Sequence, residues 1–188
     1  IRFDEEIDIE TNGQLALPHY MRREAEEIDS ERYQTVYAEN PGAIAAPTAG
    51  LHFTKEHLSK IPHTFITLHV GVGTFKPVKA DLITNHEMHS EHFNVSEEAK
   101  EKINGAEKRI SIGTTVTRVL EHMTQNDTGK IVAGSGDTNI FIYPGYEFQC
   151  VDALLTNFHL PKSTLFMLVC ALAGSDLMKE AYNKAVEE

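Results

Sequence analysis

The chain has 188 residues, 41% of them hydrophobic, which is the size and composition of one or two small globular domains. Its 28 acidic residues outnumber its 17 basic residues, so the formal net charge is −11. This charge excludes a generally basic nucleic-acid coat and a polybasic membrane anchor. Two cysteines are too few for a disulfide framework and favour a reducing cytoplasm. No apolar run approaches the roughly 20 residues that span a bilayer, so we expect a soluble protein.

The first half of the chain alternates polar connections with short structured segments. The expected elements are an edge strand at residues 1–15, a solvated connection or short helix at 17–29, a helix at 55–58 capped by Thr54, and a strand buried on both faces at 64–70. Between them, residues 41–50 form a loop of small side chains. Such a loop would let its backbone approach a ligand closely.

The second half predicts alternating strands and helices. They are a helix that begins after Ser96, a strand at 109–115, a helix at 116–123, a flexible surface loop at 126–136, a strand at 139–143, a short strand at 151–156, an apolar helix at 163–173 and a last helix with an apolar face. A strand followed by a small polar turn and a helix is typical of a parallel sheet. We therefore expect an α/β fold, a layered domain with a mostly parallel sheet.

Residues 86–92 form the densest cluster of titratable side chains in the sequence. Three of the ten histidines fall here, His86, His89 and His92, together with Glu87 and Glu91. A zinc helix of the metalloprotease type places two histidines four apart with a glutamate between them, whereas His86 and His89 are three apart and no cysteine is near. The cluster is therefore a solvated polar loop, or a ligand or acid/base cluster, in preference to a metal site.

Three further histidines lie where loops leave structured segments: His52, His69 and His159. Ligands of open α/β sheets bind outside the carboxyl ends of the strands, which favours a site at His69 with Gly71 and Gly73. A satisfied, partly buried imidazole is the alternative for each histidine. No third glycine completes a dinucleotide fingerprint, and no glycine-rich loop ends in Gly-Lys-Ser/Thr, so neither nucleotide motif is supported.

Hydroxyl and basic side chains come together at two predicted helix starts. Thr114, Thr115 and Arg118 suit a carboxylate or phosphate held by backbone N–H groups and a guanidinium. Lys162 stands in a similar place before the apolar helix. Ordinary helix capping by the threonines, with a solvated lysine, is the alternative in both places.

Several ordered motifs of the sequence resemble one family. They lie at residues 32–37 (RYQTVY), 45–53 (AAPTAGLHF), 67–71 (TLHVG), 73–75 (GTF), 88–91 (MHSE), 141–145 (FIYPG) and 156–164 (TNFHLPKST). Together they are similar to S-adenosylmethionine:tRNA ribosyltransferase-isomerases of queuosine biosynthesis. The resemblance implies transfer and isomerisation of the ribosyl part of S-adenosylmethionine onto 7-aminomethyl-7-deazaguanine at the tRNA wobble position. The implied products are epoxyqueuosine in tRNA, adenine and methionine.

The resemblance also implies a division of the chain and a set of partners. Residues 1–16 would be the remnant and linker of a small β-barrel domain, and residues 17–188 an α/β catalytic domain. The implied cosubstrate is S-adenosylmethionine, without a metal. The implied partner is tRNA, with no membrane contact, and we expect a cytoplasmic monomer.

The site residues follow from these motifs and from the positions at strand ends. The expected catalytic residues are His52, His69, His89, Glu91 and His159, with His69 or His89 as the base. The expected substrate-binding residues are Gly71, Gly73, Thr74, Thr114, Thr115 and Arg118, of which the three threonines and Arg118 would hold the aminoacyl part of the cosubstrate, and Arg32 and Lys162 for tRNA phosphate.

The acidic charge leaves other functions open, because affinity for tRNA rests largely on lysine and arginine contacts to phosphate. One alternative is an S-adenosylmethionine-binding α/β module that acts on a free base or lacks catalysis. A metal-dependent hydrolase is a third interpretation.

Overall fold

The structure is a computed structural model that describes residues 13–18, 21–71, 83–125 and 128–188. The elements in chain order are α2 (Glu27–Arg32), the 3₁₀ helix η2 (Thr48–His52), α3 (Lys55–Ser59), β1 (Thr67–His69), the 3₁₀ helix η4 (Ile83–Asn85), β2 (Glu91–Val95), α4 (Glu97–Gly105), β3 (Ile110–Ile112), α5 (Thr114–Met123), β4 (Thr124–Gln125), β5 (Lys130–Ile131), β6 (Gly134–Thr138), β7 (Ala153–Leu155), α6 (Thr164–Ala173) and α7 (Ser175–Glu187). Helices and strands are mixed along the chain, as the predicted α/β class requires.

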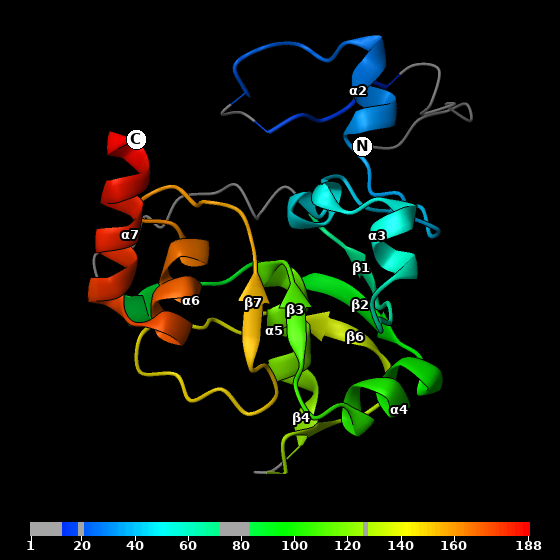
Figure 1. Cartoon of the computed structure of the whole chain (residues 1–188), viewed down its shortest axis with the longest axis vertical. Helices are drawn as coiled ribbons and strands as arrows, with labels where there is room; N and C mark the ends of the chain where they lie inside the picture. Colours follow the sequence, from blue (N-terminus) through cyan, green and yellow to red (C-terminus); the bar gives the residue numbers. More distant parts are fainter. Residues whose placement is uncertain (1–12, 19–20, 72–82, 126–127) are drawn as a thin grey trace.

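Three small sheets organise the strands (Figure 1). The largest has the order β1-β2-β6 and is antiparallel throughout. β3 and β7 form a parallel pair, and β4 pairs antiparallel with β5. Among the described residues the parallel arrangement is therefore limited to one pair, and the mostly parallel sheet is not confirmed. The expected barrel remnant at residues 1–16 lies almost entirely outside the described residues.

The central strand β2 explains why the antiparallel sheet forms. Its side chains alternate between buried and exposed, with Glu91, Phe93 and Val95 buried and His92 and Asn94 exposed. Phe93 and Val95 join the hydrophobic core, whose other buried members are Ala99, Val119, Leu120, Ile131, Cys150 and Val151. Burial of alternate apolar side chains is the usual driving force for a strand with one face on a core.

Helix α5 connects the antiparallel sheet with the parallel pair. It contacts both β3 and β6, and Figure 1 shows it between them. Six of its residues are buried: Thr114, Thr117, Arg118, Val119, Leu120 and Glu121. A surface helix buries one stripe only, so this helix is enclosed on more than one side.

Local signals predicted the helices well. Thr54, Ser96 and Ser163 each accept a hydrogen bond from the backbone N–H three residues later, as N-caps of α3, α4 and α6. The β3–Gly113–α5 unit and the short strand β7 are confirmed. Helix α5 nevertheless begins at Thr114, so residues 114–115 belong to the helix and not to the preceding strand.

Three strand predictions differ from the structure. The segment at 64–70 contributes only the half-buried residues 67–69, in place of a long strand buried on both faces. No strand forms at 139–143, where the carbonyl of Ile140 accepts a hydrogen bond from Arg118. Residues 134–136, expected in a flexible loop, form the first part of β6 because β2 supplies an edge for pairing.

Candidate functional site

One group of candidate residues lies at the carboxyl ends of the parallel strands β3 and β7. Gly113 follows β3, and its backbone N–H donates to the carbonyl of Leu155 at the end of β7, at 2.9 Å. Gly113 has φ of +94°, a conformation that favours glycine, and directly precedes Thr114 at the start of α5. The N-terminus of a ten-residue helix therefore opens beside the ends of two parallel strands.

The small-residue loop packs against this helix start. A Cβ built on Gly113 would lie 3.8 Å from the Cβ of Ala49 in η2, so η2 lies beside the start of α5. η2 ends at His52, whose Nε2 lies 3.0 Å from Oδ1 of Asn157, two residues after β7. The tertiary structure thus brings together the loops of His52, Thr114 and Asn157, which are far apart in the sequence.

His159 belongs to the same loop after β7 and is held by two contacts. Its Nε2 lies 3.1 Å from the hydroxyl of Thr156, and its backbone N–H donates to the hydroxyl of Tyr182 on α7. Burial lowers the pKa of His159 to about 4. The imidazole is therefore neutral near pH 7.

A second group is built around a buried ion pair between β2 and α5. The alternation of β2 places Glu91 on the core side, where its carboxylate is almost fully buried. Oε2 of Glu91 accepts from Nη1 of Arg118 at 2.7 Å, and Oε1 lies 3.3 Å from Nε2 of His89. Glu91 therefore links the guanidinium to the imidazole of His89.

Arg118 is bound on every side of its guanidinium. Nε donates to the carbonyl of Ile140 at 3.0 Å, and Nη2 to the carbonyls of His89 and Thr138 at 3.4 Å. Burial lowers the pKa of Arg118, while the charge and hydrogen bond of Glu91 act in the opposite direction. In this arrangement the guanidinium positions the backbone and side chain of residues 89–91, and any contact with a ligand would have to share these donors.

A third group lies on the other face of the antiparallel sheet. His69 and His92 are cross-strand partners, and their rings stack with centroids 5.9 Å apart and planes 12° apart. Nδ1 of His92 lies 3.4 Å from Oδ1 of Asp137, its cross-strand partner on β6. Nδ1 of His69 is buried without a hydrogen-bond partner among the described residues.

The remaining candidate residues are placed less centrally. Thr115 is half-buried on α5, and Gly71 is half-buried two residues after His69. Arg32 is exposed at the end of α2, which Figure 1 shows apart from the sheets. Lys162 is exposed before α6 with φ of +61°. Gly73 and Thr74 lie outside the described residues.

Sequence reasoning missed several residues at these places. Asn157 contacts His52, Asp137 faces His92, and Gly42 lies against the ring of His69. The alternation of Phe93 and Val95 with polar residues was an available signal for β2, and it would have paired His92 with a neighbouring strand. Gly42 belongs to the small-residue loop expected at 41–50, but nothing local in the sequence points to His69 as its neighbour, because the two residues are distant along the chain.

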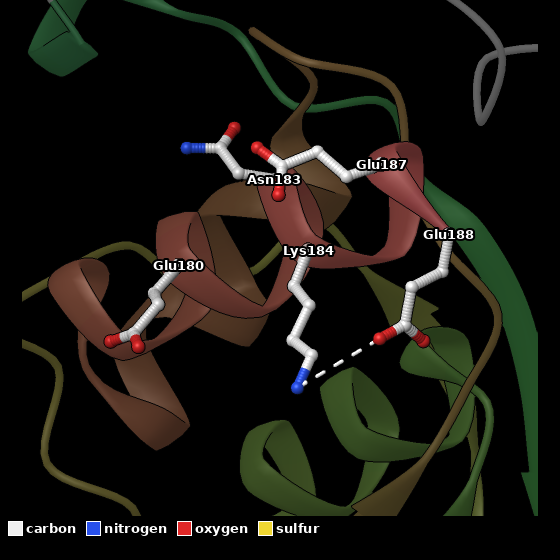
Figure 2. A pocket seen from close by; sticks show the side chains of 5 residues that line it. All are labelled: Glu180, Asn183, Lys184, Glu187 and Glu188. Carbon is white, nitrogen blue, oxygen red and sulfur yellow. Dashed lines mark ion pairs between the residues drawn. The ribbon is translucent and has the colours of Figure 1, made fainter.

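One surface hollow lies elsewhere, on α7. Figure 2 shows its five lining side chains, Glu180, Asn183, Lys184, Glu187 and Glu188, which come from the last two turns of α7 and the residue after it. All five are exposed, and Lys184 pairs with Glu188 at 3.9 Å. No candidate site residue lines this hollow, and side chains from one helix cannot enclose a ligand.

The described residues contain neither a group of metal ligands nor a membrane-spanning helix. No three histidine, cysteine, aspartate or glutamate side chains within the ranges that the structure describes are arranged to hold a metal ion. None of the helices in those ranges is long and apolar enough to cross a membrane.

Comparison with known proteins gives named relatives. A protein of Natranaerobius thermophilus named S-adenosylmethionine:tRNA ribosyltransferase-isomerase is 55% identical over 185 residues, which cover 94% of this chain and 53% of that protein. A Coxiella burnetii protein of the same name is 51% identical with the same coverage. The chain thus spans about half the length of the curated relatives it matches.

A solved structure and a family model point to the same family as these relatives. A crystal structure of an S-adenosylmethionine tRNA ribosyltransferase from Thermotoga maritima is 38% identical, with a TM-score of 0.59 over 74% of this chain and 46% of that chain. The family model described as queuosine biosynthesis protein matches residues 1–188. The chain therefore belongs to the queuosine biosynthesis protein family.

Proposed function

We propose that the protein containing this chain transfers and isomerises the ribosyl moiety of S-adenosylmethionine onto 7-aminomethyl-7-deazaguanine at the wobble position of tRNA. The products are epoxyqueuosine in tRNA, adenine and methionine. The observation that carries this proposal is the family match over residues 1–188, together with relatives of that activity at 51% and 55% identity. A tRNA substrate implies a cytoplasmic enzyme. The division into a barrel remnant and linker at 1–16 and a catalytic domain at 17–188 is part of the proposal.

The reaction makes three demands on the protein. A base must remove an acidified proton beside the sulfonium sulfur, a donor must relieve the charge on departing adenine, and the amine of the modified base must be oriented. Imidazole and carboxylate groups carry protons near neutral pH. The histidines at the strand ends and on the antiparallel sheet supply such groups.

His89 is the best oriented of the candidates for the base. Glu91 lies 3.3 Å from its Nε2, and the buried ion pair with Arg118 holds that carboxylate in place. A carboxylate beside an imidazole orients the ring and stabilises its protonated form. In this proposal Glu91 and Arg118 are positioning residues, and His89 touches the substrate.

The helix start at α5 suits the aminoacyl part of S-adenosylmethionine. Backbone N–H groups at a helix N-terminus favour a carboxylate, and Thr114 and Thr115 add hydroxyls. The small side chain of Ala49 lies next to Gly113 at this helix start. His52, Asn157 and His159 border the same carboxyl ends of β3 and β7.

The exposed basic residues Arg32 and Lys162 complete the proposal as phosphate contacts for tRNA. They are local positive charges on an acidic chain. Gly71, Gly73 and Thr74 belong to the proposed substrate site through their family motifs.

The deciding experiment incubates the full-length protein with S-adenosylmethionine and tRNA that carries 7-aminomethyl-7-deazaguanine. Mass spectrometry is expected to detect adenine and epoxyqueuosine, and neither when the tRNA carries unmodified guanine. Release of adenine with the free base but not with the tRNA would favour a free-base enzyme. Absence of both products with folded protein would favour a module without catalysis.

A paired substitution tests the base. His89→Ala is expected to lower kcat by about 10²–10⁴-fold, the usual contribution of a general base. His63→Ala is the matched control, because His63 is exposed and lies outside all three groups. If His89→Ala kept the wild-type kcat, His89 would not be the base.

A further inference from the structure

The ring of His69 is covered on one edge by the backbone of the small-residue loop. A Cβ built on Gly42 would lie 2.7 Å from Nδ1 of His69 and 2.8 Å from Cε1. Real Cβ atoms do not approach this closely, so only glycine fits, and its φ of +134° is also a glycine conformation. Gly42 therefore covers the Nδ1–Cε1 edge of the imidazole.

The face of the ring is held by a second histidine. His92 stacks on His69 at 5.9 Å, and Asp137 lies 3.4 Å from Nδ1 of His92. His92 comes from β2, which pairs with the strand of His69, and Asp137 comes from β6, which pairs with the other edge of β2. The ring of His69 is thus fixed on an edge and on a face.

Burial of Nδ1 decides which nitrogen carries the proton in neutral His69. Nδ1 is buried and has no partner among the described residues, and a buried N–H without an acceptor is rare and costly. The residue as a whole is only half-buried, so its accessible surface lies away from Nδ1. The arrangement favours the tautomer with the proton on Nε2 and a bare Nδ1.

We infer that His69 serves the reaction as a hydrogen-bond donor through Nε2–H, and not as its base. This inference rests on the proposed function. A base must offer a lone pair to the substrate. Here the accessible nitrogen, Nε2, bears the proton, and the nitrogen with the lone pair, Nδ1, is buried against Gly42. The chemical class that such a donor fits is a heteroaromatic nitrogen, as in the ring of the departing adenine. No bond to His69 forms or breaks, and Gly42, His92 and Asp137 are positioning residues.

The tautomer can be measured in the wild-type protein without any substitution. Nitrogen NMR of histidine-labelled protein is expected to show His69 with a protonated Nε2 and an unprotonated Nδ1. A protonated Nδ1 in the neutral ring would overturn the inference. This result does not depend on catalysis, so it stands apart from the proposed function, which fails if wild-type protein releases no adenine.

Two substitutions of His69 distinguish the roles of its two ring nitrogens. The side-chain amide of glutamine can take the position of Nε2, whereas the amide of asparagine can take only the position of Nδ1. His69→Gln is expected to keep kcat within about tenfold of wild type, while His69→Asn loses about 10²–10³-fold, as when one donor to a developing charge is removed. Binding of S-adenosylmethionine by calorimetry is expected to change little in either variant. Equal loss in both variants would contradict the donor role.

Gly42→Ala tests whether the contact of Gly42 with the ring of His69 positions that ring. It is expected to lower kcat more than it changes KM and to shift the nitrogen resonances of His69. Gly105→Ala is the control, since nothing lies within 4 Å of its built Cβ. Unchanged kcat and unchanged His69 resonances in Gly42→Ala would overturn the positioning role of Gly42.

Discussion

At the residue scale, the side chain that most depends on its partner is Glu91. Its carboxylate is almost fully buried and neutralises a guanidinium that is itself 2% exposed. Removal of either charge is destabilising, because the other charge then stays buried without a counter-ion. The ion pair therefore fixes the position of β2 relative to α5.

Glu91→Gln is expected to destabilise the fold by about 3 kcal/mol, since the charge of Arg118 stays buried without its counter-ion. Urea unfolding at pH 7 measures this change. Glu56→Gln is the matched control, because the ion pair of Glu56 with Lys60 is exposed and contributes little. A loss no larger in Glu91→Gln than in Glu56→Gln would contradict this account.

His159 gives the stability of the fold a pH dependence. Its pKa is about 4 when folded and near 6.5 when unfolded, so between these values the unfolded chain binds more protons. The contribution of His159 is fully present above pH 6.5 and is lost as the pH falls toward 4.

Comparison of wild type with His159→Gln isolates this contribution, with urea midpoints measured from pH 4.5 to 7. The wild-type midpoint is expected to fall more steeply with decreasing pH than that of the variant. His63→Gln, at an exposed position, is expected to follow the wild-type curve. Parallel curves for wild type and His159→Gln would show that His159 does not cause the slope.

At the element scale, the helices depend on short-range caps. The hydroxyl of Ser96 accepts from the N–H of Ala99 at 3.1 Å and so satisfies one of the free donors at the start of α4. Ala99 is part of the hydrophobic core, so this cap also fixes where α4 meets the sheet.

Ser96→Ala is expected to destabilise the protein by about 1 kcal/mol through loss of this cap. Chemical unfolding monitored by circular dichroism measures the change. Ser96→Asp is the control, because aspartate caps as well as serine and its charge suits the helix N-terminus. An aspartate variant as unstable as the alanine variant would mean that the loss comes from some other contact of Ser96.

The strands, in contrast, depend on partners that are distant in the sequence. Residues 134–138 contain two glycines and no large apolar side chain, yet they form β6. Gly136 lies opposite Phe93, where a built Cβ would approach the ring to 3.2 Å. The glycines that predicted a flexible loop are therefore compatible with a strand because they make room for the aromatic ring of β2.

At the scale of the whole molecule, an acidic chain must bind an acidic partner if the proposed function is correct. The net charge of −11 of this chain opposes association with RNA, so any tRNA contact made by these residues rests on local basic side chains. Lys162 is exposed in the turn between β7 and α6, next to the loop of His159. Its φ of +61° holds the backbone of this turn in a conformation that is uncommon for lysine.

Lys162→Gln is expected to weaken tRNA binding and to reduce the slope of log Kd against log salt concentration by about one, because one phosphate contact is lost. Filter binding from 50 to 200 mM salt measures both quantities. Lys60→Gln is the matched control, since Lys60 is exposed at the C-terminal end of the short helix α3 and pairs with Glu56. An unchanged slope in Lys162→Gln would remove Lys162 from the tRNA surface.

The sequence by itself determined the family, through its motifs, and the helices, through caps such as Thr54, Ser96 and Ser163. These signals are local, so a short window of sequence contains all the atoms that take part. The order of strands β1-β2-β6, the buried pair of Glu91 with Arg118 and the burial of Nδ1 of His69 were decided only by the tertiary structure. Each depends on a contact between residues more than twenty positions apart, and such a contact exists only once long-range packing has excluded water and chosen the partner.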